Sequence, residues 1–301
     1  MHLMKLKYWI KAFRLRTLPL SVSCILMGTA LASIQHKIQL SVLILCLTTT
    51  VLLQILSNLA NDYGDGVKGS DKNRKGEKRM VQSGLISKKQ MFTGVVIFGI
   101  LSLISGVFLL YYSFGANQLI YSFLFLVLGL FAIWGAIKYT MGKVPYGYIG
   151  LGDLFVFIFF GVIGVCGSYY LLAKDFQFIL IPGVLICGCL SVGVLNMNNI
   201  RDYNSDKSSG KFTLVVKKGI KWAKNYHVFL LITSIGSFVS LFFYTQNYLL
   251  IIGLLPITIL LINIKKVLTI TDNTQLDSEL KKIALSTFFI AVLLAISLAW
   301  F

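Results

Sequence analysis

Charged residues are scarce in this chain. Only 13% of its 301 residues are Asp, Glu, Lys or Arg, and only 11 are acidic, whereas 56% are hydrophobic and the mean hydropathy is +0.80. Soluble domains carry about 25% charged residues, so this composition excludes an ordinary soluble protein. About 20 apolar residues in a helix cross a bilayer, and the chain has room for many such spans. We expect an all-α membrane protein, a single domain formed by residues 1–301.

Two further features are missing. The five cysteines all lie inside apolar runs without the spacing of metal ligands, which argues against disulfides and against metal binding by thiolates. The net charge of +17 is not accompanied by a basic-aromatic stacking platform or a recognised DNA-binding motif, so nucleic acid is not an expected partner. Membrane topology and attraction to anionic lipid account for part of this charge, and the rest needs a local explanation.

Nine apolar runs are long enough to be transmembrane helices. They are Leu18 to Ile34, Leu40 to Leu59, Met91 to Tyr111, Gln118 to Ile137, Gly150 to Leu172, Phe178 to Asn199, Tyr226 to Tyr244, Leu249 to Ile264 and Ile283 to Phe301. We expect these helices to pack around a central cavity.

The distribution of Lys and Arg sets the orientation of these spans. The arm before the first run holds five, and the loops 61–90, 138–148, 201–225 and 265–282 hold eight, two, seven and four, so 26 of 28 fall on one side. Cytoplasmic loops carry the cationic excess. The sequence therefore predicts a multi-pass protein of the plasma membrane with a cytoplasmic N-terminus.

Two clusters rich in Asn and Asp follow directly on the second and sixth runs. The first begins at Asn58 and includes Asn61, Asp62 and Asp65, and the second begins at Asn196 and includes Asn198, Asn199, Asp202 and Asp206. Each cluster then enters a basic loop rich in Gly and Ser, which is a weak internal repeat. The repeat indicates that two helix ends meet at one cavity, on the cytoplasmic side.

The spacing of the four aspartates favours a divalent cation. Asp62 and Asp65 are three residues apart and Asp202 and Asp206 are four apart, so each pair shares one face if the helix continues that far. Magnesium takes oxygen ligands and is typically held by one or two carboxylates together with substrate phosphate. Acidic residues at span ends are costly and usually functional, although solvated turns are the simpler alternative.

The same loops carry cations that suit a phosphate ligand. The first loop holds Lys68, Lys72, Arg74, Lys75, Lys78 and Arg79, and the second holds Arg201, Lys207, Lys211, Lys217 and Lys218. For any single lysine, the alternative is that it only obeys the positive-inside rule. Taken together, the mixed acidic and basic loops fit a metal-diphosphate.

Three other charged residues lie close to span ends. Asp153 begins the fifth span, where it either serves as a favourable charge at a helix N-terminus or takes a catalytic or substrate-orienting role. Arg14 and Arg16 precede the first span, where they either contact lipid headgroups or reach a diphosphate.

These motifs resemble those of a known family. Asn61-Asp62-Tyr-Gly-Asp65 and Asp202-x-x-x-Asp206, after spans two and six of nine, are similar to the two aspartate-rich motifs of the UbiA superfamily of intramembrane prenyltransferases. The stretches 58–71, 148–157 and 198–214 bring the chain closest to the branch that prenylates 1,4-dihydroxy-2-naphthoate in menaquinone synthesis. The resemblance runs from Arg14 onward. One departure is Gly69, where the superfamily pattern has a third acid; the nearest acid here is Asp71.

The resemblance implies a reaction and a set of residues. Mg²⁺ held by Asp62, Asp65, Asp202 and Asp206 binds the diphosphate of a polyprenyl diphosphate, and the allylic group passes to 1,4-dihydroxy-2-naphthoate with loss of CO₂, giving a demethylmenaquinone. Asp153 accepts a proton or contacts a ring hydroxyl. The residues expected to bind substrate are Asn58, Asn61, Lys68, Asp71, Arg79, Asn198, Asn199, Lys207, Lys211, Arg16 and Tyr139. The prenyl tail exits between helices into membrane lipid.

Two other functions remain open on the sequence. A related prenyltransferase with a phytyl donor or a benzoate acceptor has the same motifs. A cation-coupled transporter also uses carboxylates at broken helices, but its ion site lies near the middle of the bilayer, and here no carboxylate lies at mid-span. Neither the prenyl chain length nor the oligomeric state can be read from the sequence.

Overall fold

A computed structural model describes residues 2–69, 79–272 and 275–299. Within these residues nine helical segments are long and apolar enough to cross a membrane, and each contains most of one predicted run. Their bounds are Leu6–Ala32, Leu40–Lys68, Lys88–Phe114, Leu119–Lys138, Gly152–Ala173, Leu180–Arg201, Ile220–Thr245, Tyr248–Thr269 and Leu276–Leu298. The predicted all-helical membrane fold is confirmed.

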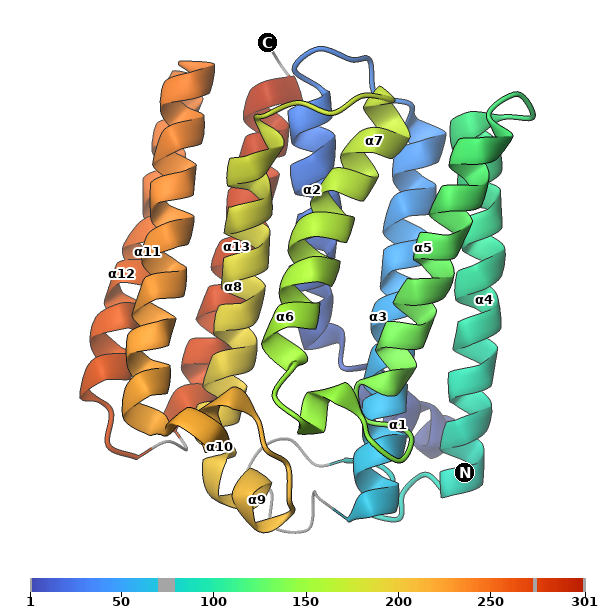
Figure 1. Cartoon of the computed structure of the whole chain (residues 1–301), viewed down its shortest axis with the longest axis vertical. Coiled ribbons are helices and arrows are strands. Elements are labelled where there is room, and N and C mark those ends of the chain that lie inside the picture. Colours follow the sequence, from blue (N-terminus) through green and yellow to red (C-terminus); the bar gives the residue numbers. More distant parts are fainter. Residues whose placement is uncertain (1, 70–78, 273–274, 300–301) are drawn as a thin grey trace.

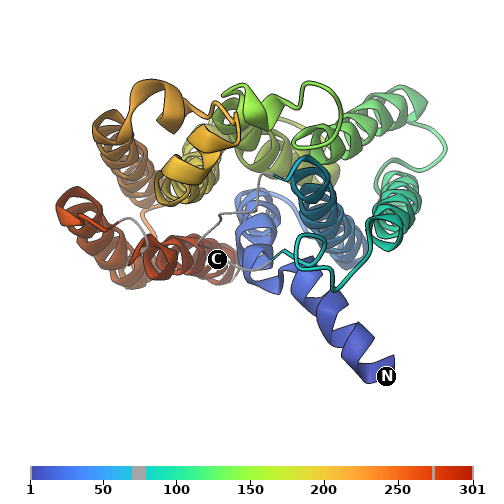
Figure 2. The same ribbon diagram turned by 90° about the horizontal axis from the view of Figure 1, so that it is seen from below.

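The spans form a closed ring of antiparallel helices (Figures 1 and 2). The ring consists of α2 (Leu18–Ala32), α3 (Leu40–Lys68), α4 (Lys88–Phe114), α5 (Leu119–Lys138), the fifth span, α8 (Leu180–Arg201), α11 (Ile220–Thr245), α12 (Leu254–Thr269) and α13 (Leu276–Ala299). The fifth span is composite, with α6 (Gly152–Val156), the π-helical segment η3 (Phe157–Cys166) and α7 (Gly167–Ala173). Helix α13 closes the ring by packing on α2.

The first helix, α1 (His2–Phe13), projects outward from the ring (Figure 2), while its residues Trp9, Ala12 and Phe13 pack against α3 and α4. It precedes α2 and leaves the bundle at an angle, because Arg14 adopts a left-handed conformation (φ 51°) that breaks the helix between them. Lys7 and Lys11 share α1 with the exposed side chains of Leu6 and Ile10. This mixture of cations and exposed apolar residues is typical of a helix that lies at the membrane surface.

The described Lys and Arg residues lie mainly at the end of the bundle that also carries α1, α9 (Tyr203–Ser208) and α10 (Leu214–Lys218) (Figure 1). We call this the basic end. The opposite end carries the connections 33–39, 115–118 and 174–179. Lys37 and Lys174 are the cationic Lys or Arg residues in these connections. The structure therefore reproduces the charge segregation that the sequence predicts.

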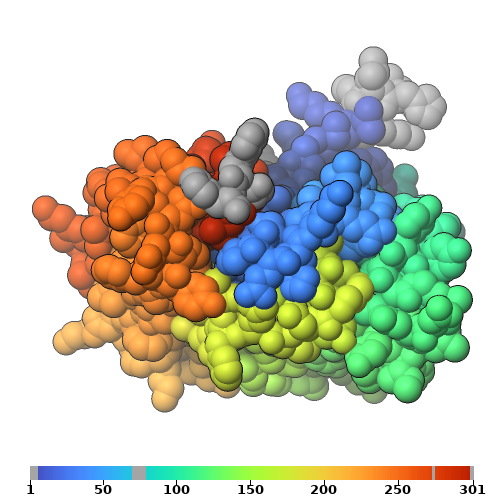
Figure 3. Space-filling view, turned by 90° about the horizontal axis from the view of Figure 1, so that it is seen from above, coloured from blue at the N-terminus to red at the C-terminus, as the bar shows by residue number. Residues whose placement is uncertain are grey.

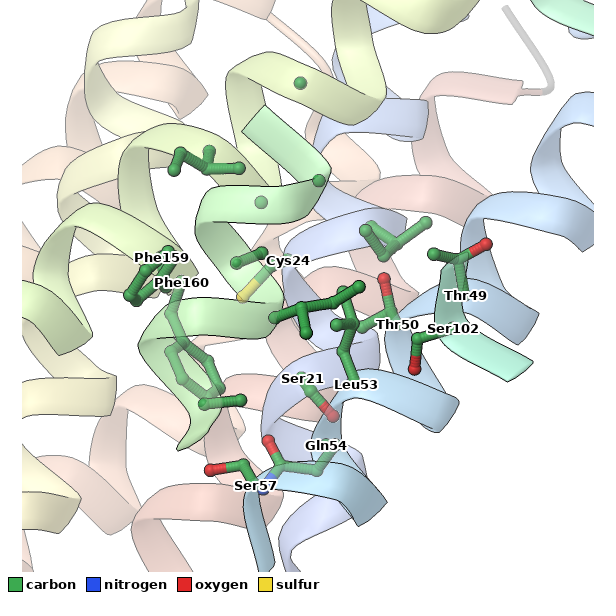
Figure 4. Close-up of a pocket in the computed structure, with 18 of the residues that line it drawn as sticks. Ser21, Cys24, Thr49, Thr50, Leu53, Gln54, Ser57, Ser102, Phe159 and Phe160 are labelled. Atoms are coloured by element: carbon green, nitrogen blue, oxygen red, sulfur yellow. The ribbon is translucent and has the colours of Figure 1, made fainter. Parts of the chain in front are cut away.

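An elongated cavity of about 390 Å³ lies inside α2, α3, α4, α5, the fifth span and α8. Its wall is mainly apolar, with Phe159 and Phe160 on one side and the polar side chains of Ser21, Gln54 and Ser57 on the other (Figure 4). From Cys46 to Asn61, a stretch of 16 residues, α3 lines the cavity, which corresponds to about 22 Å of helix. The cavity thus runs through most of the span toward the basic end.

The end of the bundle opposite the basic end is covered by two connections that pack together (Figure 3). Gln177 donates a hydrogen bond to Gln35 (2.5 Å), and His36 lies 3.6 Å from Asp175. The ammonium of Lys174 donates to Ser113 and to the carbonyl of Leu171, a residue of the cavity wall. Burial lowers the pKa of Lys174 to about 8.

Candidate functional site

The first acidic motif is carried on a regular helix. Helix α3 continues nine residues beyond the apolar run that ends at Leu59 and stops at Lys68, where Gly69 adopts a left-handed conformation (φ 72°) as its C-cap. The helix therefore extends beyond the predicted apolar run, and the condition for both aspartates of the first motif to share one helix is met. The extension places Asp62 and Asp65, three residues apart, on one side of α3, where both face the segment 79–81.

Asp62 is fully engaged with backbone amides. Its side chain is 1% exposed, and its two oxygens accept hydrogen bonds from the N–H groups of Met80 (2.9 Å) and Val81 (3.0 Å). Asp62 therefore fixes the segment that leads into α4. The cavity is lined by the neighbouring residue Asn61 and not by Asp62.

Asp65 is held from two sides. One oxygen accepts a hydrogen bond from the Arg79 guanidinium (3.1 Å) and the other from the phenol of Tyr148 (2.7 Å). The side chains of Asp65 and Arg79 are only 4% and 6% exposed, so this is a buried ion pair. Because Met80 and Val81 are held by Asp62, the same helix tip fixes both the carboxylate and its cation.

The second acidic motif lies at a break in the chain. Helix α8 ends at Arg201, Asp202 follows with φ −91° and ψ 8°, and α9 carries Asp206. The guanidinium of Arg201 binds both oxygens of Asp202, each at 2.8 Å, and the carboxylate of Asp206 lies 3.7 Å from the Lys211 ammonium. The two aspartates therefore do not share one uninterrupted helix, although the Asp206 amide still donates to the carbonyl of Asp202.

Tyr148 joins the two motifs. Its phenol donates to Asp65, and its ring lies 4.3 Å from the ammonium of Lys68 in the first motif and 5.6 Å from that of Lys211 in the second. Its carbonyl also accepts a hydrogen bond from the amide of Phe212. Sequence reasoning did not name this residue as part of the site. Its place between Gly147 and Gly150, five residues before Asp153, was a usable signal.

The segment around Tyr148 packs tightly on the first motif. A Cβ added at Gly64 would lie 2.6 Å from the Thr140 hydroxyl, so only glycine permits this approach. Thr140 donates to the carbonyl of Ala60 and lies 3.2 Å from the side-chain oxygen of Asn61. Close packing at Gly64 thus brings the connection between α5 and α6 onto the tip of α3.

Four of the predicted amide and phenol residues line the inner mouth of the cavity. They are Asn58, Asn61, Asn198 and Tyr139. Asn58 also ties helices together, because its amide donates to the carbonyl of Phe13 and to Thr17. Asn199 is buried next to them on α8 but does not line the cavity. The prediction that both helix ends meet at one cavity is confirmed.

The phenol of Tyr139 lies close to several acidic residues. Desolvation raises the pKa of its phenol well above the ordinary value, and the nearby Tyr146, Asp153, Asp65 and Asp206 raise it further. Members of both motifs and Asp153 therefore act electrostatically on one phenol. Tyr139 stays protonated at neutral pH and is available as a hydrogen-bond donor.

Asp153 is a buried carboxylate close to Tyr139. It lies in the first turn of α6 and is 5% exposed, and its Oδ2 has no hydrogen-bond partner among the described residues. A Cβ at the preceding Gly152 would lie 3.3 Å from the Tyr139 hydroxyl. A buried carboxylate oxygen without a partner is costly, and such groups are concentrated at functional sites.

The remaining predicted residues are distributed around this centre. Lys68 and Lys207 are exposed on the basic end, and the guanidinium of Arg16 lies 3.6 Å from Asp277 of α13. Asp71 falls outside the described residues, as do Lys72, Arg74, Lys75 and Lys78.

The described aspartates of the two motifs do not form a ready-made metal cluster. No group of three or more His, Cys, Asp or Glu residues lies close enough to hold an ion within the described ranges. Asp65, Asp202 and Asp206 each contact a cation instead. The charges of these three carboxylates are therefore balanced by neighbouring cationic side chains.

This arrangement is that of a polytopic membrane enzyme whose apolar cavity ends at paired acidic and basic groups. Residues 21–293 match the sequence model of the UbiA prenyltransferase family. The chain belongs to this family.

Individual relatives agree with this assignment. The chain is 47% identical over 228 residues to the 1,4-dihydroxy-2-naphthoate octaprenyltransferase of Escherichia coli (strain K12), covering 75% of this chain and 73% of the relative. It is 36% identical over 211 residues to the enzyme of that name from Mycobacterium tuberculosis, covering 70% of each.

Solved structures share the fold. A UbiA homolog from Aeropyrum pernix K1 superimposes with a TM-score of 0.68 at 16% identity, covering 93% of this chain and 96% of the homolog. A UbiA homolog from Archaeoglobus fulgidus bound to GPP and Mg²⁺ gives 0.65 at 15% identity, covering 96% and 100%.

Proposed function

We propose that this protein transfers a polyprenyl group from polyprenyl diphosphate to 1,4-dihydroxy-2-naphthoate. The allylic carbon–oxygen bond breaks, diphosphate leaves with the electron pair, a ring carbon forms the new carbon–carbon bond, and CO₂ is lost. Because no oxidant takes part, the product is the quinol form of a demethylmenaquinone. The observation that carries the proposal is 47% identity with a relative of that name over three quarters of the chain.

The shape of the site supports this reaction. A diphosphate at the basic end meets the described cations Lys68, Arg79 and Lys211, while a prenyl tail fits the apolar cavity that begins at the same mouth. The cavity wall excludes water from the allylic cation that forms as the bond breaks. A transporter needs no such combination of diphosphate cations and a cavity that begins at one end of the membrane.

The residues at the basic end fit Mg²⁺. The acidic centre offers oxygen donors, and fewer than three acidic side chains converge on any one point within the described ranges. One or two carboxylates completed by phosphate oxygens and water is the coordination that Mg²⁺ prefers. Asp65 from the first motif and Asp202 from the second would hold it, with Asp62 and Asp206 nearby. When bound, the ion neutralises the charge of the leaving diphosphate.

The chain's own residues then have separate tasks. Lys68 and Lys211 flank Tyr148 and would contact the phosphate oxygens. Arg79, whose guanidinium contacts Asp65 at 3.1 Å, would also bind the diphosphate. Tyr139 lines the cavity and Asp153 is buried close to it, so an acceptor ring would bind here with a hydroxyl near the carboxylate.

We assign the basic end to the cytoplasm and the protein to the plasma membrane. The orientation follows from the excess of Lys and Arg at that end, and the plasma membrane is what the resemblance to prenyltransferases of menaquinone synthesis implies. Cysteine accessibility tests this orientation: a charged thiol reagent added to intact cells should label Lys37→Cys but not Lys207→Cys. Labelling of Lys207→Cys in intact cells would contradict this orientation. Labelling of both variants in permeabilised cells shows that neither position is shielded from the reagent.

The function is tested by product analysis on purified protein in detergent. We expect mass spectrometry to find a demethylmenaquinol and free diphosphate when 1,4-dihydroxy-2-naphthoate is supplied with a series of polyprenyl diphosphates. Parallel reactions with a hydroxybenzoate or with phytyl diphosphate test the related activities. A product from the benzoate and none from the naphthoate would overturn the proposed acceptor.

Asp153→Asn is expected to slow transfer about 30-fold, which corresponds to the loss of about 2 kcal/mol from one hydrogen bond to a charged group. The amide keeps the size of the side chain but cannot accept a proton from the acceptor hydroxyl. The apparent KM for the prenyl diphosphate should stay within about twofold, because Asp153 lies on the acceptor side. An unchanged rate would remove Asp153 from the site.

Tyr148→Phe is expected to raise the KM for the prenyl diphosphate about fivefold, since one hydrogen bond of about 1 kcal/mol to Asp65 is lost. The ring, and with it the contacts to Lys68 and Lys211, is kept. Tyr146→Phe is the matched control, because its phenol donates to the carbonyl of Gly135 and not to either motif. Equal effects in both variants would show that Tyr148 acts only through packing.

A further inference from the structure

Asp277 lies outside both acidic motifs, yet a chain of ion pairs connects it to one of them. It lies in the first turn of α13, and its Oδ1 accepts a hydrogen bond of 2.6 Å from Arg201. Arg201 in turn binds both oxygens of Asp202. The other oxygen of Asp277 lies 3.6 Å from Arg16, at the start of the first span.

Burial makes this chain of contacts important. The side chain of Arg201 is 1% exposed, whereas those of Asp202 and Asp277 are 11% and 47% exposed. A buried guanidinium that loses its carboxylate partner strongly destabilises the folded protein. Arg201 therefore resists any movement of Asp202 unless a second carboxylate remains to balance it.

We propose that Asp277 is a positioning residue that keeps Arg201 in place and so allows Asp202 to turn to a divalent cation. The inference rests on the proposed function, because that function gives Asp202 a metal to bind. With Asp277 present, Arg201 keeps one carboxylate when Asp202 leaves. Without Asp277, the cation competes against a buried ion pair for Asp202, so the affinity for the cation falls.

Binding of Mn²⁺, as a stand-in for Mg²⁺, tests this role on the full-length protein. The EPR signal of free Mn²⁺ gives the dissociation constant without any prenyl transfer. We expect Asp277→Asn to raise this constant about tenfold, and Asp277→Glu to restore it to within about twofold of the unmodified protein. The Mg²⁺ concentration for half-maximal turnover should shift in parallel, with little change in kcat at saturating Mg²⁺.

Asp175→Asn is the matched control, since Asp175 has a similar exposure (44%) and contacts His36 at the opposite end of the bundle. It should leave Mn²⁺ binding unchanged. Asp277→Asn with normal Mn²⁺ binding and only a lower melting temperature would overturn the proposal, as would a lack of Mn²⁺ binding by the unmodified protein. Failure of the proposed function is seen separately, as the absence of prenylated naphthoate in the product analysis.

Discussion

Replacing Asp65 with Asn is expected to lower prenyl transfer about 10³-fold. In the proposed function this carboxylate helps to hold Mg²⁺ and the diphosphate, and the loss of about 4 kcal/mol of transition-state stabilisation corresponds to that factor. Product formation with saturating Mg²⁺ and donor measures the effect. Wild-type turnover in Asp65→Asn would exclude the first motif from the reaction.

The fold of this variant must be tested separately, because Asp65→Asn leaves the buried Arg79 without the carboxylate that contacts it at 3.1 Å. The double variant Asp65→Asn, Arg79→Gln removes both charges. We expect it to regain a normal melting temperature and size-exclusion profile in detergent but not turnover. If activity returned together with stability, the role of Asp65 would be structural only.

Replacing Asp62 with Asn is expected to destabilise the protein by about 4 kcal/mol and to lower turnover about 10²-fold. The Asn side chain can accept from only one of the Met80 and Val81 amides, and its own NH₂ group then faces the other, so one charge-assisted hydrogen bond is lost and one buried N–H is unsatisfied. Arg79 directly precedes Met80, so we expect its contact with Asp65 to shift as well. Small displacements at a reacting centre lower the rate by about 10²-fold.

Thermal unfolding in detergent and Mn²⁺ binding separate the two roles of Asp62. We expect a lower melting temperature with Mn²⁺ binding weakened less than in Asp65→Asn. Asp62→Asn with normal stability and complete loss of Mn²⁺ binding would show that Asp62 is chiefly a metal ligand and that its amide contacts are broken in the loaded enzyme.

Most of the fold could be predicted from local properties of the sequence. The nine spans follow from apolar length, and the common side of the two acidic motifs follows from the distribution of Lys and Arg. The exceptions were places where hydrogen bonding overrides hydropathy. Helix α3 continues through a polar stretch to Lys68, and α8 stops at Arg201 although the residues after it could continue the helix.

The candidate site was predictable only in part, because a motif gives residue types and not their partners. The sequence marked four aspartates alike, but the structure gives Asp62 two backbone amides, Asp65 a phenol and a guanidinium, and Asp202 the adjacent Arg201. These partners come from segments that are up to 83 residues away, as with Tyr148 and Asp65. The role of Asp277 is of the same kind.

The sequence by itself determined that this protein crosses the membrane nine times and carries acidic and basic groups at one end, since apolar length and charge act locally along the chain. The tertiary structure alone decided which carboxylate meets which cation and that α3 and α8 open into the same cavity. Those contacts join residues from distant helices, and only the packing of the closed ring brings such residues together.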